Sequence, residues 1–188
     1  MANLILASSS PRRQELLQQL ALRFSIHSPD IDESVLEGES ALNYVERLAR
    51  SKAKTILALH PDAVILAADT SVTFADQIIG KPDNKQHAFE IWTKLSGQTH
   101  AVMTGICVAN AEKILSAVVT TQVQFQALSL KDMEYYWATG EPVGKAGAYA
   151  IQGIAAQFVV SIEGSYSNVV GLPLHETVKL LKAVDVLN

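Results

Sequence analysis

Residues 63–68 form an unbroken apolar run, which stops at Asp69 and Thr70. An apolar run without polar alternation is typical of a strand that is buried on both faces. Such a strand needs other elements packed above and below it, so the chain must build a layered α/β structure. We expect the strand to end at Asp69 and its carboxyl end to open onto a site.

Patterns on either side of this run predict the elements that cover it. Serine is favoured at a helix N-cap and proline at the first helical position, so Ser10 and Pro11 predict a helix after a short strand over residues 3–7. Apolar residues repeat at helical spacing over residues 40–57. After this run we predict a hairpin over 71–79, a helix over 85–95 closed by Gly97, and an antiparallel pair of strands over 101–109 and 114–125. A helix from Ser129 to Trp137 should begin with a capping box. The remaining predicted elements are a structured loop over 144–153, a strand over 157–162 and a final helix from about 174. The expected fold is α/β, with a mixed sheet, flanking helices and a substantial antiparallel component, in a single domain over residues 1–188.

Composition excludes several classes of partner. The net charge of −4 over 188 residues would repel a nucleic-acid backbone, so we expect no nucleic-acid polymer as a partner. No apolar window approaches the ~18 residues of a membrane span, and the N-terminal apolar run is too short for a signal peptide. We therefore expect a cytoplasmic protein without a membrane partner. The lone Cys107 lies in an apolar strand pattern and is read as a buried hydrophobic residue rather than a catalytic one.

Two arginines at the start of the first predicted helix indicate an anion site. Arg12 and Arg13 follow a serine-rich segment and lie in the first turn. Each cation there is unfavourable by typically ~0.3–1 kcal/mol, because the helix dipole is positive at that end. Free backbone N–H groups and guanidinium forks would together hold a phosphate. The alternative is a solvated arginine pair without a ligand.

Lys52 and Asp69 are charged residues in apolar surroundings. Lys52 projects into the middle of the apolar stripe of the helix over residues 40–57, so its ammonium extends to solvent, pairs with a carboxylate or faces an anion-filled cleft. An unpaired carboxylate at the end of a buried strand is costly, which favours Asp69 as a metal ligand or a base. The alternative for Asp69 is a cap on the following turn.

Further acidic and basic residues surround the same strand end. The segment before the second helix carries Asp30, Asp32, Glu33 and Glu37. One of them could join Asp69 in holding Mg²⁺, which prefers one or two carboxylates plus substrate phosphates. Lys81 follows the hairpin in a stiff turn. Together these residues provide the cations and carboxylates that bind a triphosphate with a divalent metal, whereas the histidines show no spacing typical of zinc ligands.

Several short motifs are specific in combination. They are residues 6–17, Asp32-Glu33-Ser34, Arg47-Leu48-Ala49 with Lys52-Ala53, Ala68-Asp69-Thr70, Gly80-Lys81-Pro82, Leu95-Ser96-Gly97, residues 145–149 with Ile151-Gln152-Gly153, and Val170-Gly171-Leu172-Pro173. In these motifs the chain resembles the Maf-like nucleotide pyrophosphatases over essentially its whole length. The resemblance implies an elongated two-lobed fold, like that of inosine triphosphate pyrophosphatases, with the active site in a central cleft. Members of the family often form a homodimer.

The resemblance also implies the reaction and the residues that perform it. The family hydrolyses the bond between the α and β phosphates of nucleoside triphosphates, with a divalent metal such as Mg²⁺ or Mn²⁺. Asp69 matches the catalytic carboxylate and is implied to bind metal together with Glu33. The positions implied to bind the substrate are Ser8, Arg12, Arg13, Lys52 and Lys81.

Arg12, Thr70 and Gln152 match the branch of the family that acts on dTTP and UTP, or on modified pyrimidine triphosphates, and releases the nucleoside monophosphate and pyrophosphate. The branch specific for 7-methyl-GTP typically has Trp, Gln and Glu at these places. Two alternatives remain at this stage. One is a pyrophosphatase of the 7-methyl-GTP type, and the other is a nucleotide-binding regulator of cell division with little turnover.

Overall fold

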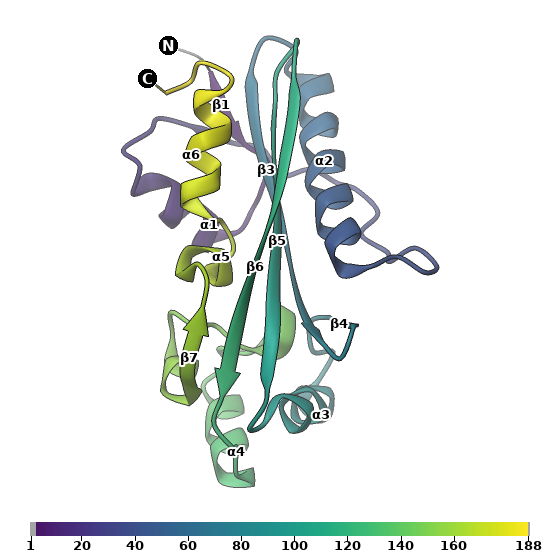
Figure 1. Cartoon of the computed structure of the whole chain (residues 1–188), viewed down its shortest axis with the longest axis vertical. Coiled ribbons are helices and arrows are strands. Elements are labelled where there is room, and N and C mark those ends of the chain that lie inside the picture. The colour runs from purple at the N-terminus through teal and green to yellow at the C-terminus, as the bar shows by residue number, and fades with distance from the viewer. Residues whose placement is uncertain (1–2, 188) are drawn as a thin grey trace.

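A long mixed sheet runs through the middle of the molecule, which is elongated along the strands (Figure 1). The computed structural model describes residues 3–187. Over these residues the sheet has seven strands in the order β2-β1-β3-β5-β6-β7, with β4 paired to β3. β1 is parallel to β2 and β3, and the other neighbours are antiparallel. The strands are β1 (Leu4–Leu6), β2 (Ser25–Ile26), β3 (Val64–Phe74), β4 (Gln77–Ile79), β5 (Thr99–Ala109), β6 (Ile114–Phe125) and β7 (Val159–Glu163).

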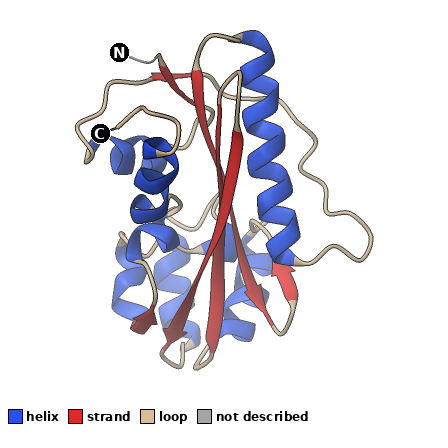
Figure 2. Cartoon of the chain, turned by 45° about the horizontal axis from the view of Figure 1, so that its top comes forward, coloured by secondary structure: helices blue, strands red, loops and turns tan. Residues whose placement is uncertain are grey.

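Helices cover both faces of this sheet. They are α1 (Pro11–Gln18), α2 (Ala41–Leu59), α3 (Lys85–Leu95), α4 (Leu130–Ala138), α5 (Tyr166–Val170) and α6 (Leu174–Lys182), with 3₁₀ turns η1 (Ala146–Ala148) and η2 (Ile154–Phe158). Figure 2 shows α2 packed along the sheet apart from the other helices. A small cluster that includes Ala49, Ala53 and Ile56 lies under α2, and the larger cluster on the other face contains residues of α1, α3, α4, α5 and α6. This arrangement confirms the predicted α/β fold with a mixed sheet and flanking helices.

Local sequence signals account for most of these elements. The hydroxyl of Ser40 accepts a hydrogen bond from Asn43 N at the start of α2, and Ser129 and Asp132 form the predicted capping box of α4. Ala75 and Asp76 have φ of 48° and 61°, which closes the predicted hairpin between β3 and β4. The antiparallel pair β5 and β6 is also confirmed.

The prediction that the strand ends at Asp69 is wrong. β3 continues to Phe74, and its register with β5 is unbroken from Ile65 to Thr73, so Asp69 lies in the middle of the strand. Polar residues extend the strand because the ladder is formed by backbone groups, whatever the side chains are. Successive side chains point to opposite faces of a sheet. Asp69 consequently lies on the face of α2 and Thr70 on the opposite face.

Smaller differences concern caps and short elements. Ser10 occupies the N-cap of α1 as predicted, but its side chain makes no capping bond, and Ser10 N donates to the hydroxyl of Ser8 instead. The strand predicted over residues 157–162 begins later, at Val159, because η2 occupies the preceding residues. The short elements β2 and α5 were not predicted, since so few residues show no periodicity. No helix within residues 3–187 is long and apolar enough to cross a membrane.

Candidate active site

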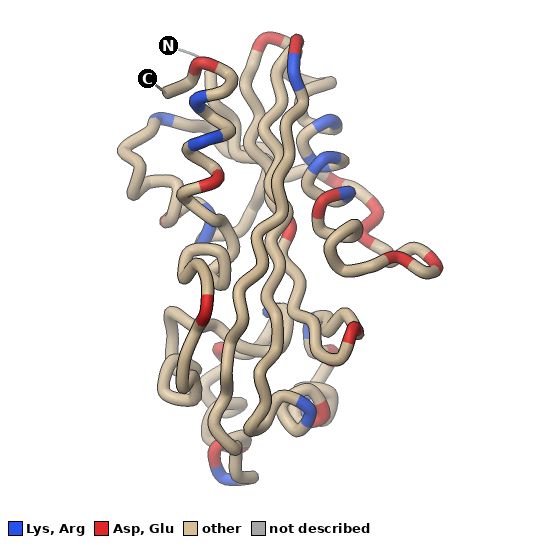
Figure 3. The backbone as a smooth tube through the Cα atoms, in the orientation of Figure 1, with Lys and Arg blue, Asp and Glu red and all other residues tan. Residues whose placement is uncertain are grey.

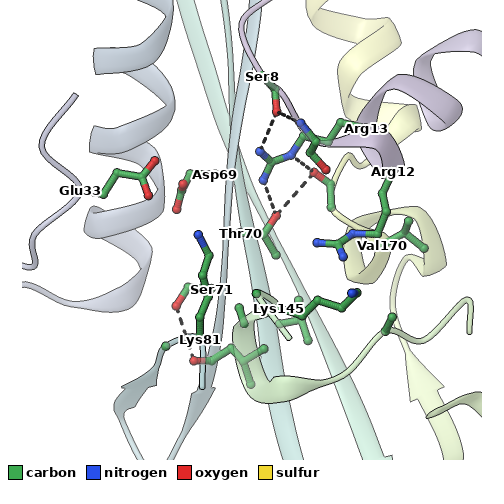
Figure 4. Close-up of a pocket in the computed structure, with 18 of the residues that line it drawn as sticks. Ser8, Arg12, Arg13, Glu33, Asp69, Thr70, Ser71, Lys81, Lys145 and Val170 are labelled. Carbon is green, nitrogen blue, oxygen red and sulfur yellow. Dashed lines mark hydrogen bonds between the residues drawn. The ribbon is translucent and has the colours of Figure 1, made fainter. Parts of the chain in front are cut away.

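All the site residues proposed from the sequence line one cleft of about 550 Å³. Its walls come from the loop between β1 and α1, the acidic segment before α2, the middle of β3, the turn after β4 and the loop before η2 (Figure 4). The predicted residues in its lining are Ser8, Arg12, Arg13, Glu33, Lys52, Asp69, Thr70, Lys81 and Gln152. The structure therefore brings together residues that are far apart in the sequence.

Lys52 joins two carboxylates at the base of the cleft. Its Nζ lies 2.7 Å from Asp69 Oδ1 and 2.6 Å from Glu33 Oε1. The side chains of Lys52 and Asp69 are 10% and 11% exposed, whereas that of Glu33 is 46% exposed. Burial opposes ionisation of Glu33, but the hydrogen bond and charge of Lys52, with the charge of Lys81, lower its pKa below the usual value. Of the alternatives for Lys52, the structure thus shows pairing with carboxylates in a cleft.

The acidic segment that carries Glu33 is held against α2 by side chains of that helix. Tyr44 Oη donates to the backbone oxygen of Glu33 (2.9 Å), and Arg47 Nη2 donates to that of Ser34 (3.0 Å). Arg47 also forms a bidentate pair with Glu39, through Nε at 2.6 Å and Nη2 at 2.7 Å. Burial, with the negative charges of Asp69 and Glu33, raises the pKa of Tyr44 to about 12, so its hydroxyl stays protonated as a donor. These contacts fix the position of the segment that brings Glu33 to Lys52 and Asp69.

Arg13 is bonded to protein atoms on the opposite side of the cleft. Its Nε donates to Gly171 O (2.8 Å), Nη1 to Ser8 Oγ (3.3 Å) and Nη2 to Thr70 Oγ1 (3.0 Å). Desolvation lowers its pKa from the usual value, an effect that Asp69 opposes. Thr70 Oγ1 also lies 2.9 Å from Thr104 Oγ1. Arg13 therefore ties α1, β3 and α5 together and presents its charge to the cleft from a fixed position.

Arg12 and Lys145 are the more open cations on this side (Figure 4). Desolvation lowers the pKa of Arg12, and desolvation together with the charge of Arg12 lowers the pKa of Lys145. Lys145 donates to Glu141 O (2.6 Å), which fixes its direction. Sequence reasoning did not propose Lys145 or Tyr44 as site residues. Lys145 stands in one of the motifs and could have been found there, whereas nothing distinguishes Tyr44 from other residues on the surface of a helix.

The loop before η2 is fixed in place by backbone contacts. Gly147 has φ of 69°, and a Cβ there would lie 2.9 Å from a methyl of Val72, so only glycine fits. Its N–H donates to Gly80 O (3.1 Å), which links this loop to the turn that carries Lys81. Trp92 Nε1 donates to Ala148 O (3.0 Å). Gln152 is exposed at the end of the loop and lines the cleft.

The chemistry of the cleft suits a polyanion bound together with a cation. Arginine and lysine side chains line two of its sides, and the only carboxylates among its described lining residues are Glu33 and Asp69. Within residues 3–187 no group of three or more His, Cys, Asp or Glu could hold a metal. Two carboxylates that converge on one ammonium nevertheless fit Mg²⁺ or Mn²⁺, because such ions take one or two carboxylates and complete their shell with water and phosphate oxygens. The fold and the site thus define a class of protein that binds a phosphorylated small molecule.

Comparison with known proteins gives the family. The model of the Maf-like protein family matches residues 3–184, and the chain belongs to this family. A dTTP/UTP pyrophosphatase of Acinetobacter baylyi is 64% identical over 97% of this chain and 100% of its own length. A second dTTP/UTP pyrophosphatase, from Colwellia psychrerythraea, is 50% identical over 95% of this chain and 86% of its own. Among solved structures, a HAM1 protein from Coxiella burnetii has a TM-score of 0.45 and 19% identity, over 66% of this chain and 73% of that one.

Proposed function

We propose that the protein is a nucleoside triphosphate pyrophosphatase that hydrolyses dTTP and UTP to the nucleoside monophosphate and pyrophosphate. The observation that carries the proposal is the group of Lys52, Asp69 and Glu33 at the base of a cleft whose other side presents Arg12 and Arg13. A triphosphate between these two sides meets cations from both. The substrate named for relatives up to 64% identical supports the choice of pyrimidine triphosphates.

In the proposed reaction Asp69 orients a water molecule and accepts its proton. The water oxygen attacks the α-phosphorus in line with the bond to the β-phosphate, that bond breaks, and pyrophosphate leaves with the electron pair. Lys52 holds Asp69 in a fixed position through the 2.7 Å contact. Arg12, Arg13, Lys81 and Lys145 neutralise the triphosphate oxygens, and no covalent intermediate is needed.

A divalent metal, Mg²⁺ or Mn²⁺, completes the proposed site. Glu33 and Asp69 would hold it, and when bound it neutralises phosphate charge and polarises the reacting groups. Lys52 lies between the same two carboxylates, and its ammonium offsets their mutual repulsion. The proposed partners are small nucleotides and a second copy of the chain. We expect no nucleic-acid polymer and no membrane as a partner. A cytoplasmic location stays a prediction.

The proposed preference for a pyrimidine base rests on Arg12, Thr70 and Gln152. Gln152 is exposed at the cleft and free to donate and accept, which suits a base that presents carbonyls beside an N–H. Thr70 differs from the other two, because its hydroxyl is engaged with Arg13 and Thr104. We infer that Thr70 acts on specificity through the position of Arg13, and that Gln152 and Arg12 approach the nucleotide directly.

A panel of purified nucleoside triphosphates with detection of pyrophosphate tests this proposal. We expect dTTP and UTP to give the highest kcat/KM and Asp69→Asn to abolish hydrolysis while binding of the same nucleotide, measured by calorimetry, survives. Faster hydrolysis of 7-methyl-GTP would overturn the substrate but not the reaction. Negligible turnover of every nucleotide, with binding intact, would instead support the regulatory alternative.

A further inference from the structure

One acidic side chain lies beside the turn that carries Gln152. Glu141 is the only acidic residue between positions 139 and 158, and the tube between α4 and β7 is mostly tan in Figure 3. Within this segment Gly153 N donates to Ala150 O (3.0 Å), which closes a β-turn with Gln152 at its tip. The Gln152 side chain is exposed and lines the cleft. The position of this turn therefore sets where the amide of Gln152 lies.

The carboxylate of Glu141 accepts hydrogen bonds from the residues that follow the turn. Ile154 N donates to Oε2 (2.9 Å), and Ala155 N donates to Oε1 (3.3 Å). These two residues begin η2, and the first N–H groups of a helix have no partner within it. A Cβ at Gly153 would overlap the carboxylate, so only glycine lets the backbone come this close. Glu141 therefore fixes the end of the turn.

Tyr136 connects the same carboxylate to the start of the turn. Its Oη donates to Glu141 Oε1 (2.6 Å) and accepts from Ala150 N (3.1 Å). Tyr136 is 2% exposed, and its ring packs against Trp92 and Phe158, with centroids 5.2 Å and 5.6 Å away. Burial, with the hydrogen bond to Glu141, raises the pKa of Tyr136, so the hydroxyl stays protonated as a donor. Tyr136 and Glu141 thus hold both ends of the turn as one hydrogen-bonded pair.

The contacts of Glu141 require an ionised carboxylate. Burial opposes its ionisation, but the hydrogen bonds from Tyr136, Ile154 and Ala155, with the charge of Lys145, lower its pKa below the usual value. A glutamine amide has one acceptor oxygen, and its NH₂ group would face at least one of these donors. Glutamine at this position therefore keeps the size of the side chain but loses part of the hold on the turn.

We propose that Glu141 and Tyr136 are positioning residues for base selection through Gln152, an inference that rests on the proposed function, in which Gln152 approaches the base. Uracil presents a carbonyl beside an N–H, whereas cytosine presents an amino group beside a ring nitrogen. An amide can pair with either edge by turning over, and hydrogen bonds weaken steeply with distance and angle. Gln152 therefore discriminates only from a fixed turn. Lys145 donates to the backbone oxygen of Glu141, so changes of the Glu141 side chain leave that contact in place.

Competition between UTP and CTP tests the proposal, because the two bases have nearly the same size. With both nucleotides at equal concentration, the ratio of UMP to CMP formed gives the ratio of the two kcat/KM values. This ratio does not depend on the fraction of enzyme that is folded, so a merely structural loss leaves it unchanged. We expect Glu141→Gln and Tyr136→Phe each to lower it about fivefold or more, the order of one hydrogen bond. In the control Glu134→Gln, at an exposed position of α4, it should stay within about twofold of wild type.

A double variant tests whether the effect passes through Gln152. Gln152→Ala should itself lower the ratio, and adding Glu141→Gln should then change it by less than about twofold, because the side chain that the turn positions is gone. A further fall in the double variant, or a wild-type ratio in both Glu141→Gln and Tyr136→Phe, would overturn the proposal. A wild-type protein that turns over neither nucleotide would refute the proposed function instead, and calorimetric Kd values for UTP and CTP would then give the ratio that decides the role of Glu141.

Discussion

Replacement of Lys52 by methionine tests the part of the site that the structure defines best. Methionine keeps the length of the side chain but removes the ammonium that lies 2.7 Å from Asp69 and 2.6 Å from Glu33. At an effective dielectric constant of ~20, the attraction between unit charges 2.7 Å apart is about 6 kcal/mol. The variant also spares the cost of desolvating the ammonium, so the net change is smaller. Loss of one partner from a buried pair typically costs ~3–5 kcal/mol.

We expect Lys52→Met to lower the free energy of unfolding by about 3 kcal/mol, at the lower end of that range because the cleft admits water. For a chain of this size the change corresponds to a fall in melting temperature of about 6–12 °C. Taken alone, the position of Lys52 on an apolar stripe suggests that methionine would be tolerated or stabilising. The two carboxylates on its ammonium reverse that expectation, since Asp69 would be left buried without a partner.

Thermal and urea unfolding at neutral pH, without added metal, provide the measurement. Lys54→Met is the matched control, because Lys54 is exposed on the other side of the same helix and its loss should change stability by less than about 0.5 kcal/mol. Adding Asp69→Asn to Lys52→Met should recover most of the loss, because the amide no longer needs a cation. A Lys52→Met protein that melts at the wild-type temperature would refute the reasoning, and so would a double variant that is less stable than the single one.

Three further predictions follow from other parts of the molecule. Arg47→Met releases the segment that carries Glu33 and should weaken Mn²⁺ binding, followed by electron paramagnetic resonance, about tenfold or more at a temperature where the variant is folded; binding as tight as in Lys54→Met would argue against this positioning role. His100 is 1% exposed, and burial lowers its pKa from 6.5 to about 4. Between pH 6.5 and pH 4 this imidazole therefore takes up a proton in the unfolded chain but not in the folded chain. Stability should therefore fall by about 3 kcal/mol as the pH drops from 6.5 to 4 and then level off, and urea unfolding of His100→Gln should lack this component. Gln152→Glu should lower kcat/KM for dTTP and UTP by about ten- to hundredfold, and less for 7-methyl-GTP, because a carboxylate against base carbonyls costs ~1–3 kcal/mol; an equal fall for all three would remove Gln152 from base selection.

Much of the local structure could be predicted because it depends on neighbours in the chain. Ser129 with Asp132, the apolar stripe of α2 and the apolar alternation of β6 are local signals, and each gave the correct element. The end of β3 was predicted wrongly at Asp69 for the same reason. A polar residue after an apolar run looks like a strand end, unless one knows that β5 continues to pair with the strand beyond it.

The site residues were recognised as a set, but their relations were not. Lys52 was expected to face a carboxylate, an anion or solvent, and only the packing of α2 across β3 decided for Asp69 and Glu33. Arg13 was expected to bind an anion from the first turn of α1. In the structure the Arg13 guanidinium donates hydrogen bonds to Ser8, Thr70 and Gly171. Arg12 is therefore the more open of the two cations.

Most helices and strands, the apolar faces and the set of charged residues could be predicted from the sequence, because these depend on residue type and on spacings of a few positions. Which charges meet depends on the packing of the layers. Lys52 and Asp69 are 17 positions apart, and Arg13 and Gly171 are 158 apart, so no periodic pattern links them. Packing also decides which edge of the sheet stays open, because β7 reaches only the second half of β6. Contacts of this kind arise from the way the layers pack, and packing is a property of the whole chain rather than of any segment.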